Sequence, residues 1–280
     1  AASFEDWAAR PLGSWGMDGG AASGEKPELA KEKLGVALSF ISDVGKVLFP
    51  SYVTSTPFQA KLRNTMMTMN AYSAELSYWR HSNPDYVALC HPNLNVDNAY
   101  FWRDERGNLD LGVLDWGFMG ARSLGHRLWW WLHCAEYDEL TANLGGYLDC
   151  LITAYHEHGG PLLDKETLRK MFVITALEQL LGLCAAVPQI LHMVPRQEWL
   201  TIEDRHDERI ARNVDGKSTL RLYLHVMCTV VRMVEEWRAD ELLATWVTEV
   251  FCGHFRSGSR CGASRATRSD SASACGRAAA

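Results

Sequence analysis

Apolar residues recur at helical spacing along most of this chain. In seven segments they fall three and four residues apart, the period that places them on one face of a helix. These segments are residues 27–49, 57–81, 123–137, 140–158, 164–193, 217–239 and 240–251. Asp164 and Asp240 are predicted N-caps, and Gly159-Gly160-Pro161 is a predicted helix stop. The pattern therefore predicts a mainly helical protein.

Between the second and third of these helices the apolar pattern changes to short runs. Residues 86–90, 98–102 and 109–114 are apolar or aromatic and too short for helices. Arg106-Gly107-Asn108 separates the last two runs and has turn composition, which predicts a β-hairpin. Because an isolated hairpin is marginal in water, we expect the helices after it to bury its inner face. The expected fold class is mainly α (α+β), a helical bundle that carries one short hairpin.

Composition and charge restrict which partners and which cellular compartment the sequence predicts. The chain has 280 residues, 47% of them hydrophobic, and a net charge of −6, which gives no electrostatic basis for binding nucleic acid. In the most apolar segment, 173–194, Glu178 and Pro188 interrupt the run, which favours a buried helix over a membrane span. The eight cysteines form no Cys-x-x-Cys pair, which is typical of free thiols in a reducing, cytoplasmic compartment.

The distribution of residue types predicts three parts. Residues 1–25 read as a flexible segment, 26–253 as one folded domain, and 254–280 as a disordered basic tail of Ser, Ala, Gly and Arg. Within the domain, Trp129-Trp130-Trp131 must point around much of one helix, so at least one ring is expected in the core. Packing between helices is favoured over the alternative, an aromatic site for a quaternary amine.

The strongest chemical signal is a polar loop after the first short strand. The loop reads Cys90-His91-Pro92-Asn93-Leu94-Asn95-Val96-Asp97-Asn98, and Leu114-Asp115-Trp116-Gly117 follows the hairpin. Phosphoryl transfer needs an Asn and an Asp that hold Mg²⁺, and a group that faces the acceptor hydroxyl. Asn98 and Asp115 supply the two ligand types, while Asn93 stands at the acceptor-facing position, where an amide cannot take up a proton. The alternative is that these residues only form turns.

These two blocks resemble motifs of the aminoglycoside phosphotransferase and choline kinase group of the protein-kinase-like fold. The pattern of that family is His-Gly-Asp-x-His-x-x-Asn, followed by an Ile-Asp-Trp-Gly-like block. By this resemblance His91 is the structural His of the loop and Asn93 stands for the catalytic Asp. Asn98 and Asp115 are then the Mg²⁺ ligands. The resemblance implies Mg²⁺ and ATP as cofactors, an unidentified small-molecule hydroxyl as acceptor, and a kinase-like C-terminal lobe over residues 26–253.

The chain also departs from the family pattern. Pro92 replaces a Gly, Asn93 the catalytic Asp and Asn95 the second His. The Gly-Asp-Pro-x-x-Asp-Leu block that often follows in the family is absent after Gly120. No Gly-x-Gly-x-x-Gly stands before His91, and no Lys there lies in a strand-like run. We therefore expect a second lobe without its first, either a fragment or a truncated gene product, to which a missing first lobe or a protein partner would be the complement.

Two functions follow from these observations. The first is Mg-ATP-dependent transfer of a phosphoryl group to a small molecule, expected to be weak or absent because Asn93 removes the general base. The second is a pseudokinase-type module that binds a ligand or a protein partner. In either case we expect Asn93, Asn98 and Asp115 to face the side that a first lobe would cover. Apolar surface exposed there would favour self-association.

Overall fold

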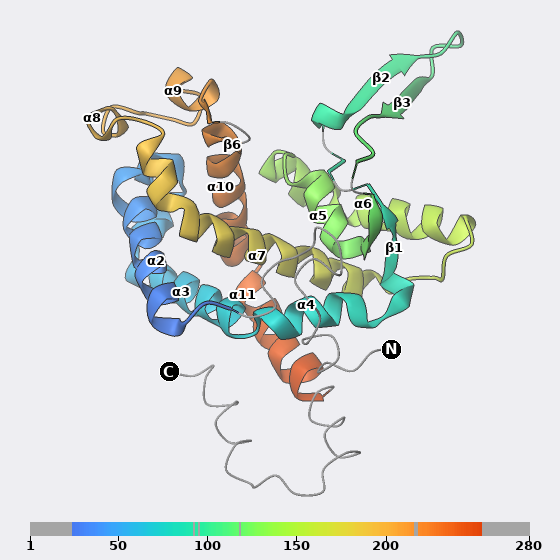
Figure 1. Cartoon of the computed structure of the whole chain (residues 1–280), viewed down its shortest axis with the longest axis horizontal. Helices are drawn as coiled ribbons and strands as arrows, with labels where there is room; N and C mark the ends of the chain where they lie inside the picture. Colours follow the sequence, from blue (N-terminus) through green and yellow to red (C-terminus); the bar gives the residue numbers. More distant parts are fainter. Residues whose placement is uncertain (1–23, 92, 95, 118, 216–217, 254–280) are drawn as a thin grey trace, which may run out of the picture.

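Helices build nearly all of the body of the protein (Figure 1). The computed structural model describes residues 24–253 except 92, 95, 118 and 216–217. The predicted disordered tail and nearly all of the predicted flexible segment, together with Pro92 and Asn95, lie outside the described residues. The longer helices are α2 (Pro27–Ser39), α3 (Thr56–Ala71), α4 (Ser73–Ser82), α5 (Leu124–Leu132), α6 (Tyr137–Glu157), α7 (Lys165–His192), α10 (Leu220–Glu236) and α11 (Ala239–Thr245). The short ones are α8 (Arg196–Trp199) and α9 (Glu208–Ala211).

The mainly helical prediction is confirmed, with two of the predicted helices divided. The first ends as α2 and continues as a π-helical turn and two 3₁₀ turns, at Phe40–Val44, Lys46–Leu48 and Ser51–Thr54. The second is two helices, α3 and α4, which meet at Tyr72. The chain ends its described part in another π-helical turn, Trp246–Phe251, after α11.

The two predicted N-caps have different outcomes. Asp164 caps α7 as predicted, because its Oδ1 accepts a hydrogen bond from the Thr167 N–H at 2.8 Å. Asp240 is not an N-cap, because α11 begins one residue earlier, at Ala239. Arg238, with a φ of 54°, makes the sharp turn from α10 into α11. A left-handed turn at a non-glycine residue has no signature in the apolar pattern.

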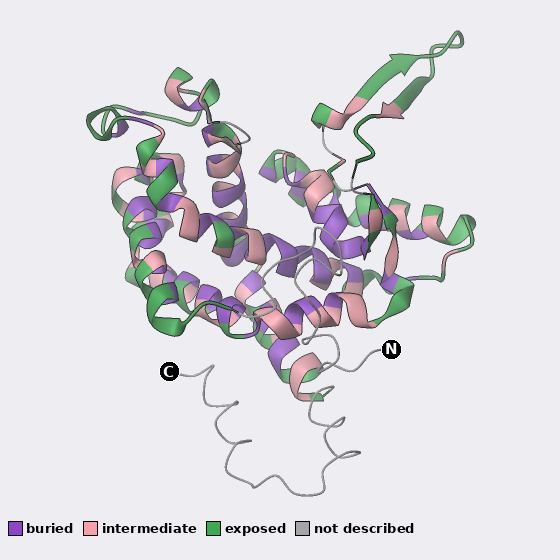
Figure 2. Ribbon diagram, in the orientation of Figure 1, coloured by how far each residue is buried: buried purple, intermediate pink, exposed green. Residues whose placement is uncertain are grey.

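Helix α7 is the central helix of the bundle. Its main neighbours are α2, α5 and α10, and α3, α6 and α11 also contact it. By length and composition alone α7 could cross a membrane, but 61% of its most apolar window is buried inside the protein. Figure 2 shows buried residues concentrated on α5, α7 and α10. A helix that is apolar around most of its circumference needs such cover, so α7 forms the axis of the core.

The strands form three two-stranded antiparallel sheets within the described residues. The predicted hairpin is confirmed: β2 (Ala99–Arg103) pairs with β3 (Leu109–Val113) in a register that sets Phe101 opposite Leu111. The first predicted strand is β1 (Val87–Cys90), which pairs with β4 (Gly120–Ser123). The remaining sheet joins β5 (Val214–Asp215) and β6 (Ser218–Thr219). The apolar pattern does not predict β4, because Gly-Ala-Arg-Ser has no apolar run.

The expected burial of the hairpin is wrong. Its strands contact mainly each other and the 3₁₀ turn η6 (Val96–Asn98), and Figure 1 shows the hairpin projecting from the body. Large apolar side chains are exposed on both of its faces, namely Tyr100, Phe101, Trp102, Leu109 and Leu111. The helices cover β1 and β4 instead, since α5 continues directly from β4. Self-association through exposed apolar surface stays a prediction.

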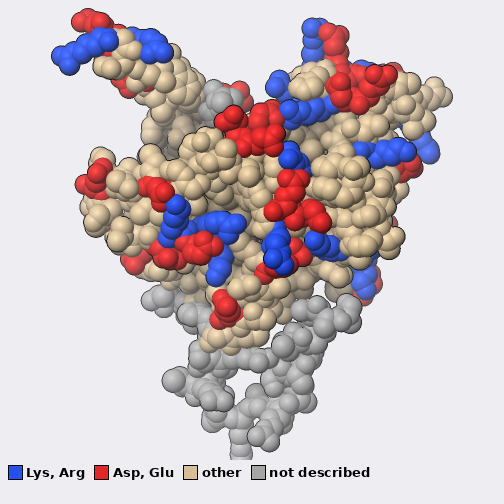
Figure 3. Space-filling view, turned by 180° about the vertical axis from the view of Figure 1, so that it is seen from behind, with Lys and Arg blue, Asp and Glu red and all other residues tan. Residues whose placement is uncertain are grey.

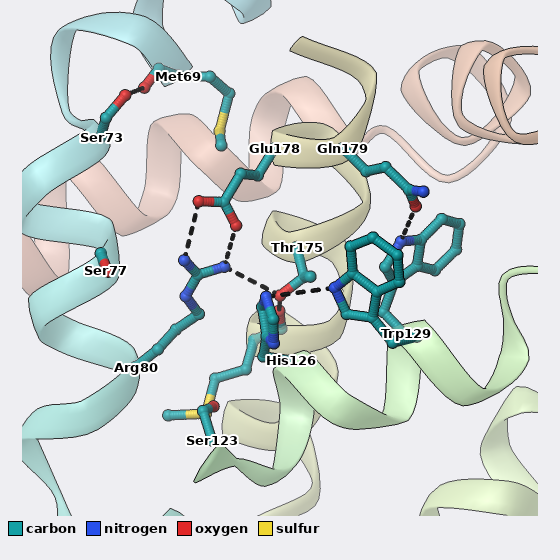
Figure 4. A network of polar contacts seen from close by, with 12 residues as sticks. Met69, Ser73, Ser77, Arg80, Ser123, His126, Trp129, Thr175, Glu178 and Gln179 are labelled. Carbon is teal, nitrogen blue, oxygen red and sulfur yellow. Dashed lines mark hydrogen bonds and ion pairs between the residues drawn. The ribbon is translucent and has the colours of Figure 1, made fainter. Parts of the chain in front are cut away.

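A partly buried ion pair joins α4 to α7 (Figure 4). The Arg80 guanidinium, 3% exposed, donates to both carboxylate oxygens of Glu178 at 2.5 and 3.0 Å and to Thr175 Oγ1 at 3.2 Å. Burial raises the pKa of Glu178, but attraction and hydrogen bonding to Arg80 outweigh burial and hold that pKa below its ordinary value. Next to this pair burial lowers the pKa of His126 to about 3, so the imidazole is neutral at pH 7.

The closest approach of α5 to α7 generates a stability prediction. A Cβ added at Gly125 would lie 2.3 Å from Met171 Cβ, so Gly125→Ala must push the two helices apart. We expect the free energy of unfolding to fall by about 1–3 kcal/mol. The matched control is Gly146→Ala in α6, where an added Cβ meets no atom within 4 Å. This control should gain about 0.5–1 kcal/mol in urea denaturation. Equal effects of the two substitutions would contradict the packing.

The ion pair predicts a second change in stability. Glu178→Gln leaves the buried Arg80 charge without its partner, and we expect a loss of about 2–3 kcal/mol at pH 7, since Glu178 itself is 34% exposed. Glu249→Gln, at an exposed carboxylate 3.9 Å from Lys170 Nζ, is the control and should change stability by less than about 0.5 kcal/mol.

The same ion pair sets a pH dependence. Because the folded-state pKa of Glu178 lies below its unfolded value, its stabilisation is complete above the unfolded pKa and is lost as the pH falls through the folded one. The free energies of unfolding of the native chain and of Glu178→Gln, measured by urea denaturation, should therefore differ most near neutral pH and become equal in acid. A difference that grows in acid would contradict this assignment.

Candidate functional site

The loop after β1 and the segment after β3 meet at the base of the hairpin. The main chain of Leu114 joins them: its N–H donates to the Asn98 carbonyl at 2.8 Å, and its carbonyl accepts from His91 Nε2 at 2.7 Å. Asp115 follows Leu114 directly, so its α-carbon lies within about 9 Å of that of Asn98, by the α-carbon spacings of a strand pair and one peptide. The two sequence blocks are therefore brought together.

His91 fixes the loop through both of its ring nitrogens. The ring is 5% exposed. The Leu114 carbonyl can only accept, so Nε2 carries the proton, and the Asn93 N–H donates to Nδ1 at 3.2 Å. Trp116 meets the ring edge-on with 5.0 Å between centroids, and Trp131 Nε1 on α5 donates to the His91 carbonyl at 3.4 Å. The imidazole thus positions the loop through main-chain partners.

Asn98 is oriented by the same loop. Its Nδ2 donates to the Asn93 carbonyl at 2.7 Å, which uses the donor end of the amide and leaves Oδ1 as an acceptor for a ligand. Asn98 is half-buried and Asn93 is exposed. The main-chain N–H and C=O of Asn93 are both engaged within the loop, the first with His91 and the second with Asn98. The loop therefore holds Asn93 beside Asn98.

Asp115 adopts a left-handed backbone conformation. Its φ is 53°, which costs a non-glycine residue about 1 kcal/mol, although Asp tolerates this region better than most residues. The side chain is exposed, and its carboxylate makes no hydrogen bond or ion pair within the part of the chain that the structure describes. The Trp116 indole turns back and donates to the Val113 carbonyl at 3.1 Å. A strained turn that presents an open carboxylate is typical of a binding site.

The neighbouring thiol does not supply a nucleophile. Burial raises the pKa of Cys90 to about 11, so the thiol stays protonated at neutral pH. Its Sγ contacts the Arg122 carbonyl at 4.0 Å, on the paired strand β4. A Cys–His pair formed by Cys90 and His91 would need a thiolate and a free imidazole nitrogen, and neither is present. The chemistry available here is oxygen coordination.

Asn98 Oδ1 and the Asp115 carboxylate are the two side-chain oxygens that the sequence predicts for a metal ion. Within residues 24–253 as described, no group of three or more His, Cys, Asp or Glu side chains is placed to hold a metal. Two hard oxygen ligands fit Mg²⁺, which takes its remaining ligands from phosphates and water. Two surface depressions of about 400 and 420 Å³ lie elsewhere, against α6 and α10, and no residue of this site lines them. The site is an open surface at the base of the hairpin.

Two residues contribute to this site although the sequence patterns do not predict it. Leu114 acts through its main chain, which has no residue signature. Trp131 acts from α5, and only its place in the Trp triplet draws attention to it. Within that triplet Trp129 is fully buried and donates to Gln179 Oε1 at 2.5 Å, while Trp130 donates to His126 Nε2 at 3.3 Å. The predicted packing of this triplet between helices is confirmed.

Comparison with protein-family models, with curated proteins and with solved structures finds no match to this chain. The resemblance to the phosphotransferase group therefore rests on the two sequence blocks.

The contacts of His91 generate a prediction. His91→Phe keeps a ring of similar size but leaves the Leu114 carbonyl and the Asn93 N–H without their partner. We expect the free energy of unfolding to fall by about 2 kcal/mol. We also expect faster amide hydrogen exchange at Leu114, because its N–H is held in the same junction. The control is His156→Phe at an exposed helix end, which loses only the exposed contact of Nδ1 with the Gly160 carbonyl at 3.1 Å and should stay within about 0.5 kcal/mol of the native chain. Unchanged exchange at Leu114 in His91→Phe would contradict the junction.

Proposed function

We propose that this chain is a kinase-like lobe that binds the phosphates of a Mg²⁺–nucleotide complex and transfers the phosphoryl group weakly or not at all. The observation that supports the proposal is the Leu114 junction: the Leu114 N–H donates to the Asn98 carbonyl, and Asp115, whose side chain is exposed, is the next residue along the chain. Asn98 and Asp115 are the ligand pair that the resemblance to aminoglycoside phosphotransferases and choline kinases implies.

Each residue of the site has a separate role in the proposed function. Asn98 and Asp115 would hold Mg²⁺, which when bound neutralises phosphate charge. His91 keeps the loop against the Leu114 carbonyl, so that the loop with Asn98 and the segment with Asp115 stay joined at the hairpin base. Asn93 faces solvent next to them, where its amide could orient an acceptor hydroxyl but could not take up its proton. Weak transfer is therefore the expected limit for this site.

A second candidate function is a binding module without catalysis. It is favoured by the helical character of the described residues before β1, which supply no sheet to lie over a nucleotide. The nucleotide would then be held on one side, unless a further lobe or a protein partner closes the site. Figure 3 shows acidic and basic side chains interspersed over one face of the body, a surface without a dominant sign of charge. The exposed apolar side chains of the hairpin distinguish this surface more clearly than its charges do.

Calorimetry with ADP, with and without Mg²⁺, tests the binding proposal. We expect ADP to bind weakly, at about millimolar Kd, and only with Mg²⁺ present, since each component completes the ligand set of the other. Asp115→Ala should weaken binding at least about tenfold. Asp110→Ala, at an exposed carboxylate of the same hairpin that accepts from the Leu111 N–H, is the matched control and should bind normally. ADP binding that ignores Mg²⁺ or survives Asp115→Ala would contradict the site.

The catalytic part has its own test. The native chain should show no ATP turnover above background with aminoglycosides or choline as acceptors. In Asn93→Asp, which restores a carboxylate at the acceptor-facing position, turnover should rise by about 10²–10⁴-fold if positioning is otherwise complete. Clear native turnover that is lost in Asp115→Ala would overturn the weak or inactive assignment while supporting the metal site.

A further inference from the structure

The β2–β3 hairpin is well formed but lacks a packing partner. Its turn is closed by the Asp104 carboxylate, which accepts from the N–H groups of Arg106 and Asn108 at 2.9 and 2.8 Å. Tyr100 stacks on Trp102 with 5.2 Å between ring centroids, and the Tyr100 ring lies over Gly112, where an added Cβ would come within 2.1 Å of it. These contacts are all internal to the hairpin. A two-stranded sheet with only internal contacts is marginal in water, so a third strand or a covering surface is expected.

Both faces of the hairpin are apolar and exposed. The register places Phe101, Leu109 and Leu111 on one face, and Tyr100 and Trp102 on the other. These five side chains expose between 40% and 64% of their surface. Figure 3 shows the hairpin with charged side chains at its tip and other side chains along its length. Most of the charged residues lie at the turn or at the strand end beside it, Asp110 lies on β3, and the other strand side chains offer mainly apolar contact.

The exposed apolar area is large enough for a stable interface. Leu114 and Trp116 continue it at the base of the hairpin, also about half exposed. With about 150–250 Å² for each aromatic side chain and somewhat less for leucine, the seven residues expose on the order of 600 Å². A stable interface buries about 800 Å² per partner, of which about 60% is apolar. The hairpin thus carries ample apolar surface for a partner, and pairing at one edge would cover the flanks of the side chains on that edge.

The two edges of the hairpin differ in their free main-chain groups. Leu114 N–H to Asn98 O and Asp104 N–H to Asn108 O fix the hydrogen-bonded pairs of the ladder. Residues 99, 101 and 103 of β2 and 109, 111 and 113 of β3 therefore direct their N–H and C=O groups outward. On β3 the Asp110 carboxylate accepts from the Leu111 N–H at 2.8 Å, and the Val113 carbonyl accepts from Trp116 Nε1 at 3.1 Å, so two outward groups of that edge are already engaged. No other strand among the described residues pairs with β2, so its edge is open.

The open edge is complementary to itself. An antiparallel pairing of two β2 strands about a two-fold axis at Phe101 sets Tyr100 opposite Trp102 of the second copy. It sets Arg103 opposite Ala99, so no like charges face each other. One face of the resulting four-stranded sheet joins two clusters of Phe101, Leu109 and Leu111. The other face extends the stack of Tyr100 on Trp102 across the axis.

We propose that β2 pairs with β2 of a second copy of this chain, so that the two hairpins form one four-stranded antiparallel sheet and the protein is a dimer. The two bodies lie at opposite ends of this sheet, which the projection of the hairpin from the body allows. The pairing uses the main-chain groups of Ala99, Phe101 and Arg103. It is independent of the nucleotide site, because no ligand of that site takes part in it.

Light scattering and sedimentation of the full chain test this proposal. The weakest interfaces of this size have a Kd of about 1 μM or more. At a protein concentration of about 100 μM the native chain should therefore be dimeric. Phe101→Lys sets two charges face to face on the axis and should raise the dimer Kd at least about tenfold, with unchanged circular dichroism. Leu200→Lys, at a residue outside the hairpin that is 76% exposed, is the control and should dimerise normally.

Cysteine cross-linking distinguishes this register from other contacts. The two Phe101 α-carbons would lie about 5.5 Å apart, within the range of a disulfide, so Phe101→Cys should cross-link on mild oxidation. Trp102→Cys should not, because Trp102 faces Tyr100 of the second copy. The native chain, with exposed Cys150, sets the background. A monomeric native chain, a Phe101→Lys variant that dimerises normally, or equal cross-linking by both cysteine variants would overturn the proposal, the first result in favour of a different partner at this hairpin.

Discussion

Helix α7 carries apolar side chains around most of its circumference, and water must be excluded from all of them. This requirement arranges the other helices, since α2, α5 and α10 lie along α7 and supply most of its cover. Gly125 lets α5 approach α7 closely enough that a single added methyl group would collide with Met171. The position of α5 in turn fixes β4, from which it continues, and β1, which pairs with β4. The polar loop after β1 therefore depends on a packing contact far from its own chemistry.

From this base the candidate site is assembled by main-chain contacts. The peptide of Leu114 accepts from His91 and donates to Asn98, so one residue joins the loop after β1 to the segment after β3. The left-handed conformation of Asp115 then directs the chain away from the hairpin with its carboxylate open. Hydrogen bonds within the loop orient the Asn98 amide. Rigid support beneath two open oxygen ligands is the physical basis for proposing that this surface holds Mg²⁺ and phosphate.

Helical spacing was sufficient to predict most of the helices, and turn composition to predict the hairpin, because both signals are local. The proximity of the Asn98 and Asp115 blocks could also be anticipated, since a hairpin returns the chain to its starting point. The projection of the hairpin could not, because Phe101 and Leu111 on one face and Tyr100 and Trp102 on the other make both faces equally apolar. The sequence also could not predict the partly buried pair of Arg80 and Glu178, which joins helices far apart in the chain.

The most direct test of the site is paramagnetic broadening of backbone amide signals by Mn²⁺ added together with ADP. Mn²⁺ takes the same oxygen ligands as Mg²⁺ and broadens signals in proportion to their proximity. A site at the Leu114 junction predicts that the amides of Asn93, Asn98 and Asp115 broaden first, while those of α10 and α11 stay sharp. Broadening that begins in α6 and α10, beside the surface depressions, would contradict a metal site formed by Asn98 and Asp115.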